Sequence, residues 1–497
     1  MAKDSTRTSA EQQRAAVAMS NTDSVTAALS ADAVGEAIAD TTGERLTIRE
    51  RLAYGVGDIG GNLIFAPISA FLLFYLTDTV GIGAAIAGTL LLFGRVLDGT
   101  MDLVIGTLID KTSTRWGKAR PWLLFSMPVL VVTFILLFNV PAGLDETAKN
   151  AYVFIMYFLC LGVGFVGSNL AYHTLLSVIT SNSAMRVSLT VIRTFCALIA
   201  TLAVNFVTFP LVQSFGGGQG GWTATVLIYG VVAAVTLLVV FFGTKERVKS
   251  TVRRDAGPKL PLRRMLGMLL RNPYFYLAFG FFLISYTVSG TAGVGIYYAT
   301  DVLGDGGLYS ILSLVQFVPL LIGLSFMPRI IGKVGKRRAI LAGTVLTIVG
   351  ILVSLIDPSN FALVLGGGLI RAVGGIPAAA GLFALVADVV DFGEWKTGVR
   401  LDGMTYAAAT AGQNFGAGLG VALVGWLLAA GDYDGTLAVQ PQSAIDMQIV
   451  IYLWLPLVLS VLMGVLMYFF NIDKNLSTIQ RDLAARRVAA ATPGENA

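Results

Sequence analysis

The sequence predicts an all-α membrane protein with twelve transmembrane helices in two halves of six. Its 497 residues are 55% hydrophobic and only 13% charged, and their mean hydropathy is +0.75. A soluble domain usually carries about 25% charged residues. The apolar residues form long runs of about 20 residues, the helix length that crosses a bilayer core. Because these runs do not alternate apolar and polar residues, a membrane β-barrel is not expected.

Composition also excludes several classes of function. The net charge of +5 lies in short loops rather than in a soluble basic domain, so no nucleic-acid partner is expected. Two cysteines, Cys160 and Cys196, are too few for a disulfide framework or a cysteine metal cluster. The sequence shows no nucleophile–base arrangement and no phosphate-binding loop. We therefore expect neither an enzyme nor an ATP-driven pump, and no cofactor.

Twelve apolar runs mark the predicted helices. They are 51–77, 83–109, 121–141, 148–180, 187–213, 222–243, 273–299, 306–330, 337–356, 360–390, 403–430 and 447–471. Residues 1–48 are polar and lack the apolar segment of a signal peptide, so they are predicted to form a mobile cytoplasmic tail. The remaining divisions are an N-terminal half (49–243), a cytoplasmic linker (244–272), a C-terminal half (273–474) and a second cytoplasmic tail (475–497).

Basic residues lie in loops on one side of the predicted membrane. Lys and Arg crowd the connections between helices 2 and 3, 6 and 7, and 8 and 9, whereas Lys149 is their only representative in the opposite loops. Since basic loops stay in the cytoplasm, both termini are predicted to be cytoplasmic, in a multi-pass protein of the cell membrane.

The two halves carry a repeat. The loop after helix 2 reads DKTSTRWGKARPW, and the loop after helix 8 reads GKVGKRRAI, so each lies between the second and third helix of its half. Two six-helix halves related as a parallel repeat describe one common class of secondary transporter. Together with twelve spans and cytoplasmic termini, the repeat predicts the major facilitator architecture.

Helix 2 carries three charged residues within the membrane, in the segment GRVLDGTMDLVIG. A charge at mid-bilayer costs about 2.5–3.5 kcal/mol on insertion scales, so such residues are candidates for function. Arg95, Asp98 and Asp102 are spaced i, i+3 and i+7 and fall on one helical stripe. Their charges sum to −1. Binding of one Na⁺ or H⁺ would neutralise the stripe before the protein changes between its outward- and inward-facing states. The alternative is a purely structural ion pair between Arg95 and Asp98.

Other polar residues lie within the predicted helices. Amides, aromatic faces and imidazole suit neutral ligands rich in hydroxyl groups, and a buried arginine can bind such hydroxyls or pair with a carboxylate. A residue of this kind, taken singly, more often makes a hydrogen bond between helices. The residues are Asp58 and Asn62 in helix 1, Asn169, Tyr172 and His173 in helix 4, and Arg193 in helix 5. For Arg371 in helix 10 we favour a packing role.

Several motifs resemble those of the glycoside–pentoside–hexuronide:cation symporters, the melibiose-permease-like family. They are YGVGDIGGN and FYLTDTVG in helix 1, the helix 2 segment with its following loop, and ADVVDFGEWKTGVRLDGMTYA, expected to be the loop between helices 10 and 11. The likeness spans most of residues 50–470. It implies the major facilitator fold and symport of a sugar with a cation.

The resemblance also implies roles for individual residues. The cation-binding carboxylates fall on Asp98 and Asp102, which would be metal ligands if the coupling ion is Na⁺. The sugar-contact positions fall on Asn62, Asn169, His173 and Arg193, supported by Asp58, Tyr172 and Asn414. The chain departs from the family's best-known member, which has aspartates at 62 and 169 and a tryptophan at 173. Many members have a lysine at position 414, so its loss should leave the carboxylates more dependent on the cation.

We therefore expect a symporter that imports a glycoside, pentoside or related sugar with H⁺ or Na⁺ by alternating access. Its expected partners are the sugar, a monovalent cation and membrane lipid. Charge pairs between the halves, involving Arg115 and Asp391 in the cytoplasmic loops, would form gates. The alternatives are a lipid or amphiphile carrier of the same fold, and a sugar sensor that does not transport.

Overall fold

The computed structural model describes residues 46–180, 182–247, 261–474 and 476–491. These residues include twelve helices long and apolar enough to cross a membrane, which confirms the predicted all-α membrane architecture. The spans are Ile48–Thr79, Ala84–Lys111, Arg120–Leu137, Glu146–Ile179, Met185–Ser214, Gly218–Gly243, Pro273–Val302, Leu308–Val334, Lys336–Ser354, Phe361–Thr397, Asp402–Ala430 and Gln442–Phe469. Most boundaries agree with the predicted runs to within a few residues.

Several spans combine an α-helix with a π-helical or 3₁₀ segment. The first half contains α2 (Ile48–Gly55), α3 (Gly57–Phe74), η1 (Tyr75–Thr79), α4 (Ala84–Lys111), α5 (Arg120–Leu137), α6 (Glu146–Tyr157), η2 (Phe158–Phe165), α7 (Val166–Ile179), α8 (Ser183–Ser214) and α9 (Gly218–Gly243). The second half contains α11 (Pro273–Gly290), η3 (Thr291–Gly293), α12 (Val294–Tyr297), η4 (Tyr298–Val302), α13 (Leu308–Val334), α14 (Lys336–Ser354), α15 (Phe361–Thr397), α16 (Asp402–Ala430), α17 (Gln442–Ile449), η5 (Val450–Trp454) and α18 (Leu455–Phe469). Outside the spans lie α10 (Leu262–Leu270), η6 (Ile472–Lys474) and α19 (Leu476–Ala491).

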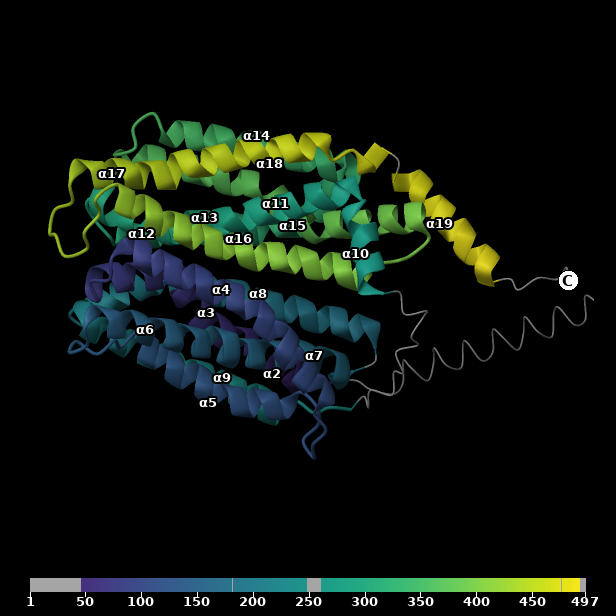
Figure 1. Cartoon of the computed structure of the whole chain (residues 1–497), viewed down its shortest axis with the longest axis horizontal. Coiled ribbons are helices and arrows are strands. Elements are labelled where there is room, and N and C mark those ends of the chain that lie inside the picture. The colour runs from purple at the N-terminus through teal and green to yellow at the C-terminus, as the bar shows by residue number, and fades with distance from the viewer. Residues whose placement is uncertain (1–45, 181, 248–260, 475, 492–497) are drawn as a thin grey trace, which may run out of the picture.

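The two halves lie side by side, with α2–α9 in one and α10–α18 in the other (Figure 1). At their interface α4 packs on α16, and α8 packs on α13. Glycines allow a close approach, because a Cβ added to Gly88 would lie only 3.1 Å from Gly425 Cα. Small residues are typical of helix crossings in membranes, where van der Waals contact replaces the hydrophobic effect.

The repeat expected from the basic loops is visible in their contacts. Arg120, at the start of α5, donates from Nη2 to the Phe241 carbonyl at the end of α9 (2.6 Å) and lies 4.7 Å from the centre of that ring. Arg337, at the start of α14, donates to the carbonyls of Met467 (3.2 Å) and Tyr468 (2.6 Å) at the end of α18. Each half thus uses an arginine of its basic loop to join its third transmembrane helix to its sixth.

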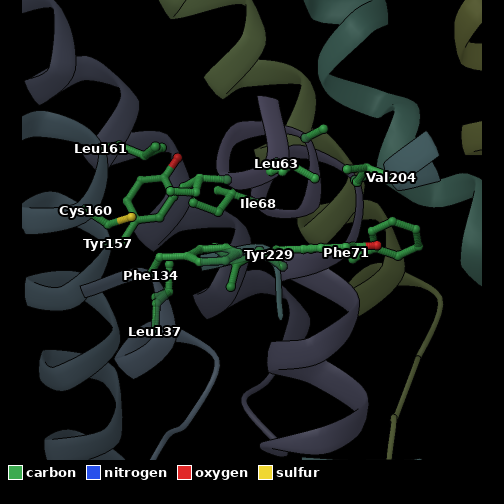
Figure 2. Close-up of a cluster of buried hydrophobic side chains, with 14 of the residues drawn as sticks. Leu63, Ile68, Phe71, Phe134, Leu137, Tyr157, Cys160, Leu161, Val204 and Tyr229 are labelled. Atoms are coloured by element: carbon green, nitrogen blue, oxygen red, sulfur yellow. The ribbon is translucent and has the colours of Figure 1, made fainter. Parts of the chain in front are cut away.

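The core of the first half surrounds α3. Figure 2 shows Leu63, Ile68 and Phe71 of α3 in one cluster with Phe134 of α5 and Tyr229 of α9. All five side chains are buried. Because α3 is enclosed on several sides, the polar side chains that it carries toward the site are held on a rigid element.

Three segments expected as loops or tails contain helices. The loop between helices 10 and 11 is shorter than predicted, because α15 continues to Thr397 and ends at Gly398, whose φ is 73°. Residues 398–401 alone connect it to α16. The linker contains α10, and the expected tail at 475–497 contains α19, which Asp482 joins to Trp395 of α15 (Oδ2 to Nε1, 2.9 Å). The tail predicted for residues 1–48 lies almost wholly outside the described residues.

Candidate functional site

Three of the predicted site residues meet between α3, α7 and α8. Arg193 Nε donates to Asp58 Oδ2 at 2.8 Å, and Arg193 Nη2 lies 2.9 Å from His173 Nε2. The Arg193 and Asp58 side chains are only 18% and 14% exposed, whereas His173 is exposed. The sequence left the partner of Arg193 open, and the structure assigns it to Asp58. The arginine is thereby oriented, and the exposed imidazole beside it is the more accessible group.

Two tyrosines brace this cluster. The rings of Tyr54 and Tyr172 stack with their centres 4.6 Å apart, and Tyr172 Oη donates to the Tyr54 carbonyl at 2.7 Å. The Arg193 guanidinium carbon lies 5.1 Å from the centre of the Tyr172 ring. A guanidinium over an aromatic face is a favourable cation–π contact. Tyr172 is 3% exposed, so its ring supports Arg193 and has no free surface for a ligand.

Asn62 and Asn169 differ in how they are held. Asn62 Nδ2 donates to the Asp58 carbonyl at 2.8 Å, and its Oδ1 accepts from Thr201 Oγ1 of α8 at 3.1 Å. Asn169 lies on α7, one turn before His173, and is half-buried. Among the described residues it has no side-chain hydrogen bond. Thr201 was missed by the sequence analysis, because a threonine in an apolar helix carries no signal of its own.

The charged stripe of α4 lies in the same half. Arg95 and Asp98 are 9% and 7% exposed, and Asp102 is half-buried. Within the part of the chain that the structure describes, no ion pair joins Arg95 to either aspartate. The alternative of a structural Arg95–Asp98 pair is therefore absent from this conformation. Arg95 instead donates from Nη2 to Ser69 Oγ at 3.2 Å and lies over the Phe65 ring at 4.8 Å.

Asp98 is incompletely satisfied. Among the described residues, its buried Oδ1 has no hydrogen-bond partner, and neither has the buried Nε of Arg95. A Cβ placed on Gly162, in η2, would lie 3.4 Å from Asp98 Oδ1, so the glycine leaves room beside the carboxylate. Asn414 faces the same helix, because a Cβ on Gly99 would lie 3.8 Å from Asn414 Nδ2. The structure thus places the predicted cation carboxylates and Asn414 on facing helices.

A metal ion here would need ligands besides acidic side chains. Among the described residues, no group of three or more His, Cys, Asp or Glu side chains is placed to hold a metal ion. Na⁺ takes oxygen ligands, so Asp98 and Asp102 would have to be complemented by neutral oxygens. A proton needs no such set, and the geometry is compatible with either ion.

One face of α3 connects the two clusters. Asp58 contacts Arg193, Asn62 follows one turn later, and Phe65 and Ser69 contact Arg95. These four positions of α3 are spaced i, i+4, i+7 and i+11, which is a single helical stripe. Phe65 also stacks on Phe165 of η2, with ring centres 5.1 Å apart. The substrate candidates and the charged stripe of α4 therefore share a rigid helix.

The halves are closed at the end away from the basic loops. Thr77 Oγ1 and Tyr297 Oη lie 2.8 Å apart across the interface, and Tyr433 Oη donates to Asp78 Oδ1 at 2.7 Å. Tyr309 Oη donates to Asn205 Oδ1 at 2.8 Å between α13 and α8. The sequence analysis missed these contacts. A signal was available, since FYLTDTVG at 74–81 recurs as YYATDVLG at 297–304, and both segments end in a π-helical turn.

The cytoplasmic gate expected from Arg115 and Asp391 is not formed in this structure. Asp391 pairs with Arg400 of the same half (3.0 Å), which also binds Glu394 and Asp402 (2.7 Å each). The hydrogen bond that Arg400 donates to Glu394, followed by those it donates to Asp402 and Asp391, raises the pKa of Arg400. Arg115 lies over the Trp116 ring at 4.9 Å. A gate between the halves stays a prediction for another conformation.

The closed end yields a testable prediction. In Asp78→Ala, the Thr77 and Tyr433 hydroxyls lose a carboxyl acceptor. Since a hydrogen bond contributes about 0.5–1.5 kcal/mol, we expect the ratio of closed to open molecules to fall roughly two- to tenfold. Spin labels at Ser214→Cys and Leu437→Cys should report longer distances by double electron–electron resonance. Asp357→Ala, at an exposed loop, is the control; unchanged distances in Asp78→Ala would contradict the prediction.

Comparisons with known proteins agree with this architecture. The family model for MFS/sugar transport proteins matches residues 53–474. The isoprimeverose transporter of Lactiplantibacillus pentosus is 34% identical over 436 residues, covering 86% of this chain and 89% of that protein. The glucuronide carrier protein homolog of Escherichia coli strain K12 is 29% identical over 453 residues, covering 89% of this chain and 97% of that protein.

Solved structures support the fold. The inward open conformation of the xylose transporter XylE from E. coli matches with a TM-score of 0.56 at 15% identity, covering 84% of this chain and 95% of that chain. The nucleoside transporter NupG matches with a TM-score of 0.57 at 15% identity, covering 85% and 98%. The matched relatives are named as transporters and symporters rather than enzymes. This chain belongs to the MFS/sugar transport protein family and, within the major facilitator fold, to the glycoside–pentoside–hexuronide:cation symporters.

Proposed function

We propose that this protein imports a glycoside, pentoside or related sugar together with one H⁺ or Na⁺ by alternating access. The observation that carries the proposal is the buried Asp98 carboxylate, whose Oδ1 has no hydrogen-bond partner in the part of the chain that the structure describes. A buried unpaired carboxylate is costly as an anion, and a bound proton or cation relieves that cost. Asp98 and Asp102 would hold the coupling ion, with Asn414 on the facing helix near Gly99.

The cluster around Arg193 is the proposed sugar site. Its arginine is held by Asp58 and Tyr172, and His173 beside it is exposed. Guanidinium and imidazole groups donate hydrogen bonds to sugar hydroxyls. Amide groups are added by Asn62, one turn after Asp58 on α3, and by Asn169, one turn before His173 on α7. Several relatives are named for sugars or glycosides, which supports this class of substrate.

Coupling between ion and sugar would run through α3. Neutralising the stripe of α4 alters the charge beside Arg95, which contacts Phe65 and Ser69 of α3. The same helix carries Asp58 and Asn62 at the proposed sugar site. Because α3 is held in the core, a shift at one end is transmitted along it rather than absorbed locally.

The proposed orientation follows from the basic loops. Those loops would lie in the cytoplasm, with both termini, in the cell membrane. The contacts of Thr77 with Tyr297 and of Asp78 with Tyr433 would then close the outer side. The structure would represent an inward-facing state, ready to release sugar and ion to the cytoplasm.

The proposal can be tested in cells that express the protein. A panel of glycosides and pentosides is added to lightly buffered, de-energised suspensions with and without Na⁺, while external pH and labelled uptake are recorded. Proton symport predicts alkalinisation on addition of one sugar. Sodium symport predicts no pH change but labelled uptake that requires Na⁺.

Other outcomes separate the alternatives. Sugar binding without accumulation under any cation gradient would contradict the proposal and indicate a sensor. Transport of a lysolipid, with no transport or binding of any sugar on the panel, would contradict the sugar site and indicate an amphiphile carrier. Cells carrying the empty vector set the baseline in both measurements.

A further inference from the structure

An apolar groove runs along the membrane-facing surface of the second half, between α14 and α18. Its volume is about 420 Å³, and its lining runs from Leu341 to Ile348 on α14 and from Val461 to Phe469 on α18. Val345, Val465 and Tyr468 are 61%, 46% and 63% exposed. Along α14 the lining from Leu341 to Ile348 covers about 10 Å at 1.5 Å per residue, which suits part of one acyl chain.

The groove has a basic end. Arg338 lies on the same face of α14 as the lining residues, three positions before Leu341 and seven before Val345. Arg338 is exposed, and within the described residues no ion pair involves it. Its neighbour Arg337 is already engaged with the Met467 and Tyr468 carbonyls. One free guanidinium therefore lies where the groove reaches the basic surface of the protein.

The internal repeat shows that the groove comes from specific residues. Arg337 and Arg120 occupy equivalent positions in the two halves. Each lies over an aromatic ring, so Tyr468 is equivalent to Phe241. Gly464, four residues before Tyr468, then corresponds to Leu237, and Thr344, seven after Arg337, corresponds to Met127. Leu237 is 4% exposed, and Met127 packs against the core. Pro121 stands in the place of Arg338, so the first half has bulkier side chains and no charge there.

We propose that this groove binds one acyl chain of an anionic phospholipid whose phosphate lies against Arg338. The chain would cover the exposed valines, and the open space beside Gly464 and Thr344 would admit it. Basic residues at the membrane surface attract anionic headgroups, whereas a zwitterionic headgroup gains much less. The groove lies on the lipid-facing side of α14 and α18, so lipid binding there is independent of the proposed sugar site.

Native mass spectrometry of the purified full chain tests the proposal. The protein is equilibrated in detergent with equal amounts of phosphatidylglycerol and phosphatidylcholine. The detergent is then removed under mild conditions, and the lipid that stays bound is measured. We expect phosphatidylglycerol to be retained over phosphatidylcholine by about fivefold for the single charge of Arg338. Arg338→Gln should lose this preference, and Lys111→Gln, an exposed basic residue of the same side, should keep it.

A second pair of variants tests the groove itself. Thr344→Met/Gly464→Leu reproduces the first half and should lose the retained lipid of both kinds. Gly366→Leu places the same side chain in open space on α15 and should retain lipid as the unchanged protein does. Equal retention of the two lipids by the unchanged protein would overturn the headgroup assignment. If the folded Thr344→Met/Gly464→Leu variant retains as much lipid as the unchanged protein, the groove is not the lipid site. The same conclusion follows if the unchanged protein forms a dimer that only this variant lacks.

Discussion

Asp98→Asn should abolish accumulation of sugar against its gradient while leaving downhill equilibration intact. The substitution sets the charge of the Arg95–Asp98–Asp102 stripe to zero permanently, so the transporter no longer needs a cation to change state. One monovalent cation crossing 100 mV supplies about 2.3 kcal/mol, which corresponds to an accumulation ratio of about fiftyfold. We expect that ratio to fall to one in labelled-uptake measurements on energised vesicles.

A matched control lies on the same helix. Asp110→Asn makes the same change at the end of α4, where the carboxylate is 58% exposed and pairs with Lys118. It should accumulate sugar normally. Asn414→Lys supplies the missing positive charge from the facing helix, and uptake by this variant should depend less on the cation. Normal accumulation by Asp98→Asn would contradict the role of Asp98, and unchanged cation dependence in Asn414→Lys would contradict that of position 414.

Arg193→Gln should lose sugar binding and stability together. Arg193 and Asp58 are largely buried, and removing one partner of a buried ion pair costs about 3–5 kcal/mol because the other charge is left unpaired. The same substitution removes the guanidinium that contacts His173. Isothermal titration with the transported sugar and thermal unfolding in detergent would measure the two losses separately.

The double variant Asp58→Asn/Arg193→Gln distinguishes structure from binding. It removes both charges, so most of the stability should return, whereas sugar affinity should stay low because the guanidinium is absent. Arg371→Gln makes the same change in the second half, where Arg371 contacts Tyr452 and Gln316, and should leave affinity unchanged. Recovery of full affinity by the double variant would show that Arg193 serves only to neutralise Asp58.

The periodicity of the α-helix explains why some site residues were predictable from the sequence. The helix 2 stripe needed no tertiary information, because i, i+3 and i+7 positions share a face in any α-helix. The Arg193–Asp58 pair was not predictable in this way, since 135 residues separate its members. The loop after helix 10 is shorter than predicted for a local reason, because its first polar residues continue the helix to Thr397.

The sequence by itself determined the membrane class, the number of spans and the division into halves. These depend on hydropathy, run length and charge bias, which act within one segment at a time. Only the tertiary structure decided which polar groups pair. Arg193 binds Asp58, Tyr433 donates to Asp78, and Asp98 Oδ1 lacks a partner among the residues that the structure describes. Such choices depend on how helices distant in the chain pack, and two arrangements with the same hydropathy pattern can differ in every one of them.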